Sequence, residues 1–225
     1  MKRHFCNLFT AILSILYILN SIPLLISAFY TGNVTYIIQE LIFIVPYCIG
    51  NFIIATLLIY SSFKNPVKID ESLKSMFVSF LGTNLYVILS WFINFKNPNA
   101  NTNILYIAVI LQLFIQAFYI FALVNLGINL TVLPEARNLK TTGIYSISRH
   151  PLYASYMIMN ILNLFVNQSL LYIPVMIICN LLQYARAKSE EQILTEAFPE
   201  YKEYKNNVMF FGKKSWFKNN NKKTA

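Results

Sequence analysis

Four long apolar runs constrain the fold of this chain more than any other feature of its sequence. They cover residues 5–29, 36–62, 75–95 and 103–127, and they contain almost no charged residues. A helix crosses a bilayer with about 20 apolar residues, and such a helix satisfies its own backbone hydrogen bonds in lipid. Each run therefore predicts a transmembrane helix, and the chain is predicted to be an all-α integral membrane protein.

The composition fits one membrane domain. Hydrophobic residues make up 56% of the chain and charged residues 12%, against the roughly 25% charged residues of soluble domains. No loop is long enough for a separate soluble domain, so residues 1–225 form one predicted unit. The run from Phe5 exceeds the h-region of a signal peptide, which spans about 7–15 residues, and is interpreted as the first helix. Cys6, Cys48 and Cys179 lie in apolar stretches without metal-ligand spacing, which is typical of small buried side chains.

Two shorter apolar segments, residues 153–166 and 169–185, follow the four long ones. The first would be roughly 21 Å long as a helix, which is less than the ~30 Å hydrocarbon core. The polar stretch "FVNQSL" (165–170) between them predicts the turn of a short helical hairpin. About six transmembrane helices are therefore expected, although a hairpin that enters the membrane and returns would give the same charge pattern.

The basic residues predict the orientation, because Lys and Arg accumulate in cytoplasmic loops. With both termini in the cytoplasm, only Lys96 falls on the outer side. The net charge of +9, including the basic tail at 209–225, is explained by this topology and by attraction to anionic lipids, so no nucleic acid partner is expected. The short chain and its Asn, Ile and Lys bias suggest a bacterial inner membrane, and a eukaryotic protein of this kind would lie in the endoplasmic reticulum.

The polar segment "LPEARNLKTTGIYSISRHPLY" (133–153) precedes the hairpin. Gly143 permits a tight turn, and Pro151 favours the first turn of a new helix. Arg149 and His150 are therefore expected where that helix begins, and its free N–H groups suit a carboxylate. Alternatively, Arg149 is only a topological anchor and His150 only a helix cap.

One face of the fifth helix is predicted to be polar. Its residues are spaced by three or four positions, so they lie on one side of the helix. In lipid such a face must contact protein or a water-filled cavity. Hydrogen bonding between helices and the wall of a substrate cavity both explain it. The residues of this polar stripe are Tyr153, Tyr156, Asn160, Asn163 and Asn167.

The segment "YARAKSEEQILTEAFPEYKEY" (184–204) follows the hairpin. Arg186 and Glu190 are four residues apart and share a face, while Glu191 lies about 100° around the helix. Apolar residues occupy a second face, which predicts an amphipathic helix along the membrane surface that Pro199 ends or interrupts. An ordinary charged helix is the alternative interpretation.

The topology brings the polar segments 128–152 and 186–208 to the same membrane face, one hairpin apart. One is basic and the other carries adjacent glutamates, so together they could bind a zwitterionic ligand. The sequence contains no Gly-rich nucleotide loop of the Rossmann type and no set of metal ligands. A binding or catalytic region at 128–208 is therefore predicted, preceded by the four long helices within 1–127.

The two segments together resemble a known family. "LKTTGIYSISRHPLYAS" and, about thirty residues later, "RAKSEEQILTEAFPEYKEY" are similar to the isoprenylcysteine carboxyl methyltransferase family and its phospholipid methyltransferase relatives. The resemblance covers about residues 126–208 and rests on an Arg-His-Pro-x-Tyr motif, a hairpin and an Arg-x-x-x-Glu-Glu motif. The sequence departs from the family pattern at Ile144, Ser146, Ser155 and Pro199, and none of these removes a group to which chemistry is assigned.

This resemblance implies a membrane methyltransferase that uses S-adenosylmethionine on the cytoplasmic side. It implies that Arg186 faces the acceptor group of a lipophilic or prenylated substrate, whose lipid part enters along Tyr156 and Asn160. Glu190 would be the base if the acceptor were a protonated amine, whereas a carboxylate acceptor needs none. The residues implied to bind the cofactor are Leu139, Lys140, Tyr145, His150, Pro151, Leu152, Tyr153, Glu190 and Glu191.

Two other functions remain open from the sequence. Sterol reductases, which use NADPH, resemble this C-terminal region through a similar His-x-x-Tyr element at a hairpin, but the chain is short for one of them. A non-catalytic membrane scaffold would use the polar stripe only to pack helices.

Overall fold

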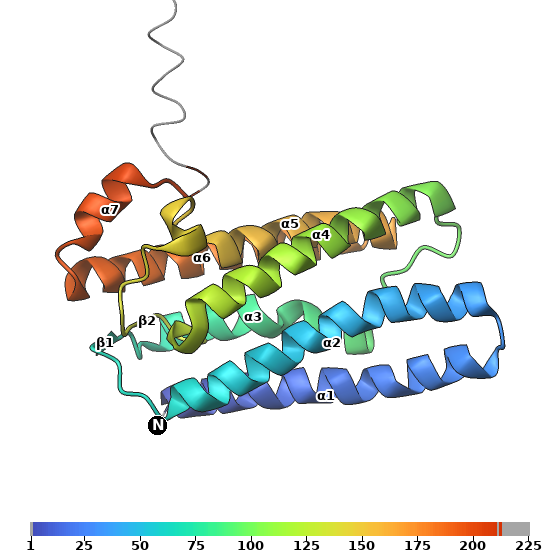
Figure 1. The fold of residues 1–225 in the computed structure, drawn as a ribbon, viewed down its shortest axis with the longest axis horizontal. Coiled ribbons are helices and arrows are strands. Elements are labelled where there is room, and N and C mark those ends of the chain that lie inside the picture. Colours follow the sequence, from blue (N-terminus) through green and yellow to red (C-terminus); the bar gives the residue numbers. More distant parts are fainter. Residues whose placement is uncertain (1, 211, 213–225) are drawn as a thin grey trace, which may run out of the picture.

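Six long helices run back and forth along one axis in the computed structural model, which describes residues 2–210 and 212 (Figure 1). The N-terminus and the short helix α7 (Tyr201–Asn207) lie at the same end of the bundle. The six helices are α1 (Lys2–Tyr30), α2 (Val34–Ser62), α3 (Leu73–Phe92), α4 (Thr102–Leu126), α5 (Pro151–Asn167) and α6 (Tyr172–Ala197).

The four predicted long spans are confirmed. Four described helices are long and apolar enough to cross a membrane: Arg3–Tyr30, Glu40–Ser62, Leu73–Phe92 and Thr102–Asn129. Side-chain caps help to begin two of them, because Ser72 accepts a hydrogen bond at the start of α3 and Asn101 accepts two at the start of α4. The protein is therefore an all-helical integral membrane protein.

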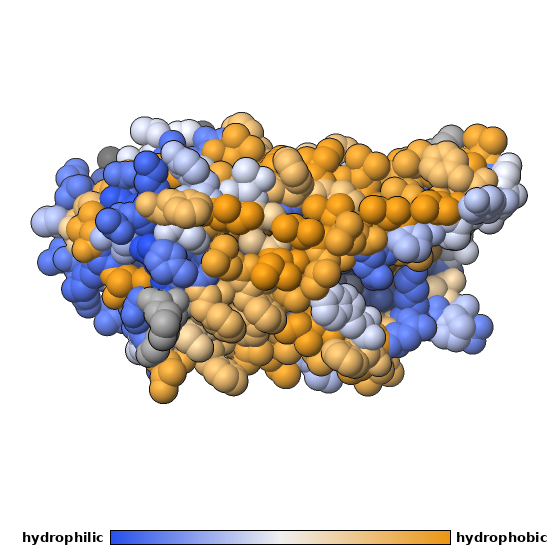
Figure 2. Space-filling view, turned by 90° about the horizontal axis from the view of Figure 1, so that it is seen from below, coloured by the Kyte–Doolittle hydropathy of each residue, from blue (hydrophilic) through white to orange (hydrophobic). Residues whose placement is uncertain are grey.

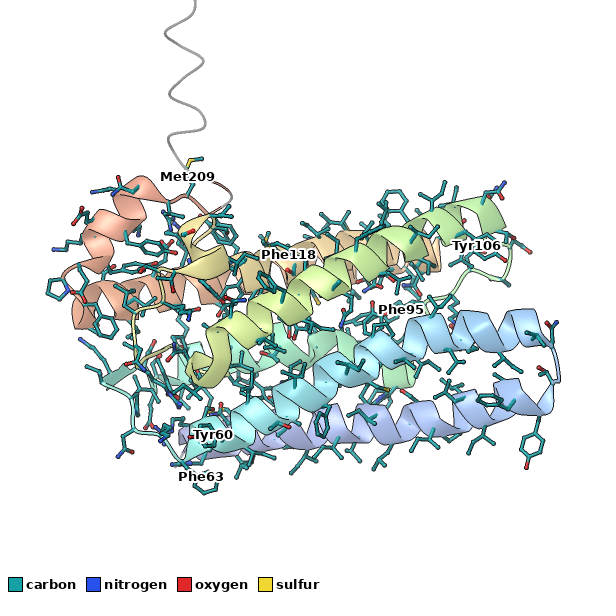
Figure 3. The ribbon with its side chains drawn as sticks, viewed as in Figure 1. Tyr60, Phe63, Phe95, Tyr106, Phe118 and Met209 are labelled. Carbon is teal, nitrogen blue, oxygen red and sulfur yellow. The ribbon has the colours of Figure 1, made fainter. Side chains whose placement is uncertain are left out.

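The surface is divided as a membrane protein requires. Figure 2 shows a hydrophobic band across the middle, with hydrophilic residues gathered at the left end and a smaller group at the right end. Exposed aromatic side chains lie near both ends: Tyr60 and Phe63 beside the N-terminus, and Tyr106 at the opposite end (Figure 3). Such aromatic residues are typical of the boundaries between membrane and water.

The predicted hairpin is present, and its turn is tied to the far end of the bundle. Gln168 ends α5 in the left-handed conformation, and α6 begins at Tyr172. The Gln168 side chain accepts from the Asn101 backbone N–H at 2.7 Å and donates to the Asn101 carbonyl at 2.8 Å. The Asn97 backbone N–H donates to the Asn167 carbonyl at 2.9 Å. The hairpin turn therefore lies beside the loop that joins α3 to α4.

One prediction needs correction. α6 runs unbroken from Tyr172 to Ala197, so the segment from Arg186 onward is the end of the hairpin helix and does not form a separate surface helix. No Gly or Pro follows Pro174 inside α6, and a change from apolar to charged residues alone does not break a helix. α6 ends at Ala197, two residues before Pro199, which agrees with the prediction that this proline ends or interrupts the helix. α7 follows. Most of the basic tail predicted at 209–225 lies outside the described residues.

The loops at the N-terminal end of the bundle are held together by a small sheet and a buried ion cluster. β1 (Lys68–Ile69) pairs with β2 (Glu135–Ala136) in antiparallel register. The Glu135 carboxylate lies 2.9 Å from Arg137 Nη2 and 3.9 Å from Arg3 Nε. Two short 3-10 helices, η1 (Gly127–Asn129) and η2 (Gly143–Ser146), complete the segment that leads to α5. Residues far apart in the chain are thereby fixed at this end.

Gly143 gives a test of the turn before α5. It has φ +63°, and a Cβ placed there would lie 2.6 Å from Asn125 Oδ1, whereas Gly32 has φ +64° and open space around it. Alanine at a positive φ costs about 1–2 kcal/mol, and only Gly143→Ala adds a clash. We expect Gly143→Ala to lower the thermal unfolding midpoint in detergent more than the control Gly32→Ala. Equal losses would show that the contact with Asn125 does not constrain the turn.

Candidate functional site

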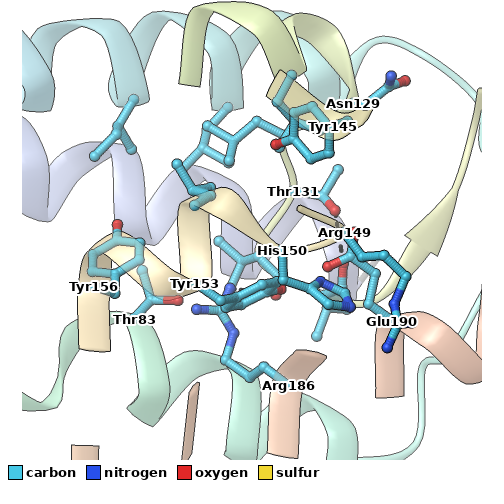
Figure 4. Close-up of a pocket in the computed structure, with 17 residues that line it drawn as sticks. Thr83, Asn129, Thr131, Tyr145, Arg149, His150, Tyr153, Tyr156, Arg186 and Glu190 are labelled. Carbon is cyan, nitrogen blue, oxygen red and sulfur yellow. Dashed lines mark hydrogen bonds between the residues drawn. The ribbon is translucent and has the colours of Figure 1, made fainter. Parts of the chain in front are cut away.

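A cavity of about 50 Å³ lies where α5 begins and the charged end of α6 passes it (Figure 4). The prediction that the two polar segments meet is confirmed, because both contribute to its wall. Seven of the residues predicted to form the site line it: Tyr145, His150, Leu152, Tyr153, Tyr156, Arg186 and Glu190.

Arg186 is the dominant charge in this cavity, and it is 6% exposed. Its Nη1 donates to Gln183 Oε1 at 3.0 Å, and its Nη2 donates to the Val132 carbonyl at 3.4 Å. Its guanidinium carbon lies 5.2 Å from the centre of the Tyr153 ring, which favours a cation. A Cβ on Gly82 would lie 2.6 Å from Arg186 Cδ, so the missing side chain at Gly82 makes room for the arginine.

The guanidinium of Arg186 lacks a compensating carboxylate. Within residues 2–210, the ion pairs at this end of the bundle involve Glu135, Glu191 and Glu196, and none includes Arg186. Its Nε is buried and has no hydrogen-bond partner among the described residues. An unpaired buried charge is costly, so this geometry suits a ligand that brings a negative charge.

Glu190 and Glu191 have different surroundings, although the family resemblance assigns both to the cofactor. Glu190 lines the cavity. Glu191 is 2% exposed and does not line it. The Glu191 carboxylate lies 2.8 Å from Arg149 Nη2, 3.1 Å from His150 Nε2 and 2.8 Å from Lys205 Nζ. The expected direct contact between Glu191 and the cofactor is therefore not supported, because its carboxylate binds these three groups.

The contacts of Glu191 join the start of α5, the end of α6 and α7. Burial raises the pKa of the Glu191 carboxyl, but hydrogen bonds from His150 and Lys205 and the charge of Arg149 outweigh burial and hold this pKa well below its ordinary value. Arg149 also donates to the carbonyls of Lys205 and Val208. Arg149 is therefore more than a topological anchor, because it ties the segment after α6 to the start of α5.

The start of α5 forms another wall of the cavity. Pro151 occupies the first helical turn as predicted, and His150 precedes it without a side-chain hydrogen bond to the helix terminus. The alternative interpretation of His150 as only a helix cap is therefore not supported, although the residue occupies the N-cap position. Its ring packs 5.5 Å from the Tyr153 ring centre and 4.9 Å from the Phe210 ring centre. His150 thus contributes an aromatic surface beside the cavity while its Nε2 contacts Glu191.

Besides Glu191, three other predicted cofactor residues do not line the cavity. Leu139 and Lys140 lie between β2 and η2, are partly exposed, and line neither this cavity nor its neighbour. Pro151 is buried but supports the helix start without lining the space. The cavity instead includes Asn129 and Thr131 from the loop after α4, which the sequence did not indicate.

A second cavity of about 150 Å³ lies deeper in the bundle, and the polar stripe of α5 borders it. Tyr156, Asn160 and Asn163 line this space. Asn160 Nδ2 also donates to Asn180 Oδ1 at 3.1 Å, and Asn163 Oδ1 accepts from Gln112 Nε2 at 2.6 Å. Both interpretations of the stripe therefore hold, because these side chains pack helices together and line a cavity.

Comparison with known proteins supports the resemblance seen in the sequence. Residues 107–196 match the model of the isoprenylcysteine carboxyl methyltransferase (ICMT) family. This segment extends from α4 to the charged end of α6 and contains both motifs. A search of curated proteins gives no significant match. The resemblance is thus confirmed over this segment, which indicates a membrane methyltransferase.

The Glu191 cluster predicts a pH dependence of stability. Because the folded pKa lies below the ordinary glutamate value of about 4.3, the stabilisation is complete above that pH and is lost as pH falls toward the folded pKa. We expect Glu191→Gln to cost on the order of 3 kcal/mol at pH 7 and much less at pH 3. Thermal unfolding in detergent at both pH values measures this difference.

Glu196→Gln is the matched control for this experiment. Glu196 lies one and a half turns along α6 and pairs with Lys68 at 2.7 Å, but both side chains are more than 40% exposed. Exposed pairs contribute about 0–1 kcal/mol, so the unfolding midpoint should change little. A Glu191→Gln deficit that stays the same at pH 3 would contradict the proposed charge cluster.

Proposed function

We propose that this protein transfers a methyl group from S-adenosylmethionine to the carboxylate of a lipophilic acceptor at the cytoplasmic face of the membrane. The observation that carries this proposal is the buried, unpaired guanidinium of Arg186 at the cavity between the two motifs. The match of residues 107–196 to a carboxyl methyltransferase family supports the same reaction type.

A carboxylate acceptor suits Arg186 chemically. A guanidinium presents a planar set of N–H donors that matches the two oxygens of a carboxylate. Gln183 and the Val132 carbonyl occupy only part of these donors and leave Nε free. A neutral or cationic acceptor would leave the buried charge uncompensated. Arg186 therefore favours an acid over an amine.

Several groups around the cavity are suited to the cofactor. Asn129 Oδ1 and the Tyr145 hydroxyl are buried and have no hydrogen-bond partner among the described residues, so they can bind polar atoms of a nucleoside. The Glu190 carboxylate suits ribose hydroxyls or an ammonium group. No side chain caps the start of α5, so its free N–H groups suit a carboxylate. The space of about 50 Å³ is narrow, so binding of the cofactor requires the cavity to widen.

Bound S-adenosylmethionine would supply a methyl group on a positively charged sulfur. The carboxylate attacks without a general base, so the residues of the protein need only hold the reactants in line and exclude water. Arg186 orients the carboxylate through its N–H groups. The rings of Tyr153 and His150 form an apolar wall that shields the transfer from solvent.

The same proposal includes six membrane crossings with both termini in the cytoplasm. α5 and α6 are antiparallel, and their turn is hydrogen-bonded to the loop between α3 and α4. The turn thus lies at the same end of the bundle as the loop between α3 and α4. This position supports a hairpin that crosses the whole membrane, and not one that enters it and returns. The exposed apolar band faces membrane lipids, and a bacterial inner membrane remains our expectation for this short chain.

Ligand binding tests the cofactor assignment. We expect the detergent-solubilised protein to bind S-adenosylmethionine and S-adenosylhomocysteine in calorimetric titrations and to ignore NADPH. Glu190→Ala should weaken both interactions about tenfold, because a charge-assisted hydrogen bond contributes about 1.5–3 kcal/mol. Tight NADPH binding without a response to S-adenosylhomocysteine would instead support a reductase, and binding of neither would support a scaffold.

Arg186 is expected to act on the acceptor. Arg186→Ala should reduce methyl transfer to a farnesylated cysteine analogue by 100-fold or more, while the affinity for S-adenosylhomocysteine changes less than threefold. Lys202→Ala, which removes an exposed cation of α7, is the control and should behave like the wild type. Equal losses of turnover and cofactor affinity would place Arg186 in the cofactor site. An aminolipid methylated faster than the acid would overturn the carboxylate assignment.

The number of crossings can be measured by labelling cysteines in intact cells. After Cys6, Cys48 and Cys179 are replaced by alanine, Leu170→Cys places a thiol at the hairpin turn, where Leu170 is 84% exposed. We expect a membrane-impermeant maleimide to label this thiol from outside and to label Glu203→Cys in α7 only after lysis. Labelling of Leu170→Cys only after lysis would indicate a hairpin that does not cross.

A further inference from the structure

The second cavity adjoins the site around Arg186. Ile54, Thr83 and Tyr156 line both spaces. Gln183 lines the deeper cavity, and its Oε1 accepts the hydrogen bond from Arg186 Nη1. A molecule whose carboxylate binds Arg186 can therefore extend directly into the deeper cavity.

The wall of this deeper cavity is unusually polar for the interior of a membrane protein. It includes six carboxamide side chains, which come from five different helices. Polar groups at this depth are costly unless they are hydrogen-bonded, and a pocket for a hydrocarbon chain needs none of them. The carboxamides are Asn51, Asn84, Gln116, Asn160, Asn163 and Gln183.

Five of these six amides already donate at least one hydrogen bond within the protein. Asn84 Nδ2 donates to Thr10 Oγ1 at 3.1 Å and to the Phe80 carbonyl at 3.0 Å. Asn51 Nδ2 donates to the Tyr47 carbonyl at 2.9 Å. The unpaired oxygen of Gln116 and the N–H groups that remain can therefore bind a ligand that carries a hydroxyl group, which both donates and accepts.

Gln116 has a buried amide oxygen without a hydrogen-bond donor in the part of the chain that the structure describes. It is 3% exposed, and its Nε2 donates to the Pro46 carbonyl at 3.4 Å. Its Oε1 is buried without a hydrogen-bond partner among the described residues. A Cβ on Gly50 would lie 2.8 Å from Gln116 Nε2, so the glycine leaves room for this amide beside the cavity. A buried acceptor without a donor is costly, and a ligand donor at this position would remove that cost.

We propose that the acceptor is a lipophilic carboxylic acid that carries hydroxyl or N–H donors along the part of the molecule inside the membrane. This inference rests on the proposed methyl transfer to a carboxylate and specifies the class of substrate. A plain hydrocarbon tail would leave Gln116 Oε1 unpaired and would displace water from the other amide oxygens without replacing its hydrogen bonds.

The test compares two acids of equal length with the full-length protein in detergent. Hexadecanoic acid and the same acid with a mid-chain hydroxyl group are titrated in the presence of S-adenosylhomocysteine, and formation of their methyl esters is measured with S-adenosylmethionine. We expect the hydroxylated acid to bind about tenfold more tightly, which is the factor that one buried hydrogen bond contributes.

Gln116→Met removes the unpaired oxygen with little change in side-chain volume and should abolish the preference. Gln192→Met is the control, because Gln192 is exposed near the end of α6 and lines neither cavity. S-adenosylhomocysteine affinity serves as the check that each variant is folded. The comparison of the two acids with the wild-type protein tests the substrate class even if neither variant folds.

The outcomes separate this inference from the methyl transfer itself. Equal or tighter binding of the plain acid, with S-adenosylhomocysteine binding intact, would overturn the substrate class and leave the methyltransferase function standing. A preference that survives Gln116→Met would overturn the role of this amide. Failure to bind S-adenosylhomocysteine and to methylate either acid would overturn the proposed function and the inference together.

Discussion

The carboxylate of Glu191 holds together the segments that surround the site. It contacts Arg149 and His150 at the start of α5 and Lys205 on α7, while its own backbone belongs to α6. Arg149 at the start of α5 and Lys205 on α7 converge on this one buried anion and compensate its charge. The position of the 143–150 turn relative to α6 depends on this cluster, and so does the shape of the cavity between them.

Glu190, the residue before Glu191, faces the cavity and not the ion cluster, and helix geometry explains the difference. Successive side chains on a helix point about 100° apart, so Glu190 reaches the cavity when Glu191 reaches the cluster. Arg186, four residues before Glu190, lies on the same side and also lines the cavity. One face of α6 therefore carries the side chains that line the cavity. The adjacent face carries Glu191, whose ion pairs connect α6 to the start of α5 and to α7. A pair of adjacent glutamates is thus explained by two separate requirements.

The sequence predicted what depends on local pattern and missed what depends on distant contacts. Apolar length predicted the four long helices, and "FVNQSL" predicted the hairpin turn. Chain topology brought Arg149 and Arg186 to the same end. The sequence could not show that Glu191 faces other side chains, because that depends on which elements pack against α6. It also could not show that Leu139 and Lys140 lie outside the lining of the cavity, because the position of the segment after β2 depends on contacts with other elements.

The guanidinium of Arg186 differs from those of the other buried arginines because no carboxylate within the described chain pairs with it. Arg137 is paired with Glu135, and Arg149 with Glu191, so both are neutralised within the protein. Arg186 has only Gln183, the Val132 carbonyl and the Tyr153 ring, all of which are neutral. No carboxylate among the described residues lies within ion-pair distance of Arg186, although Glu190 lines the same cavity. The guanidinium therefore remains available to the carboxylate of a molecule that binds there.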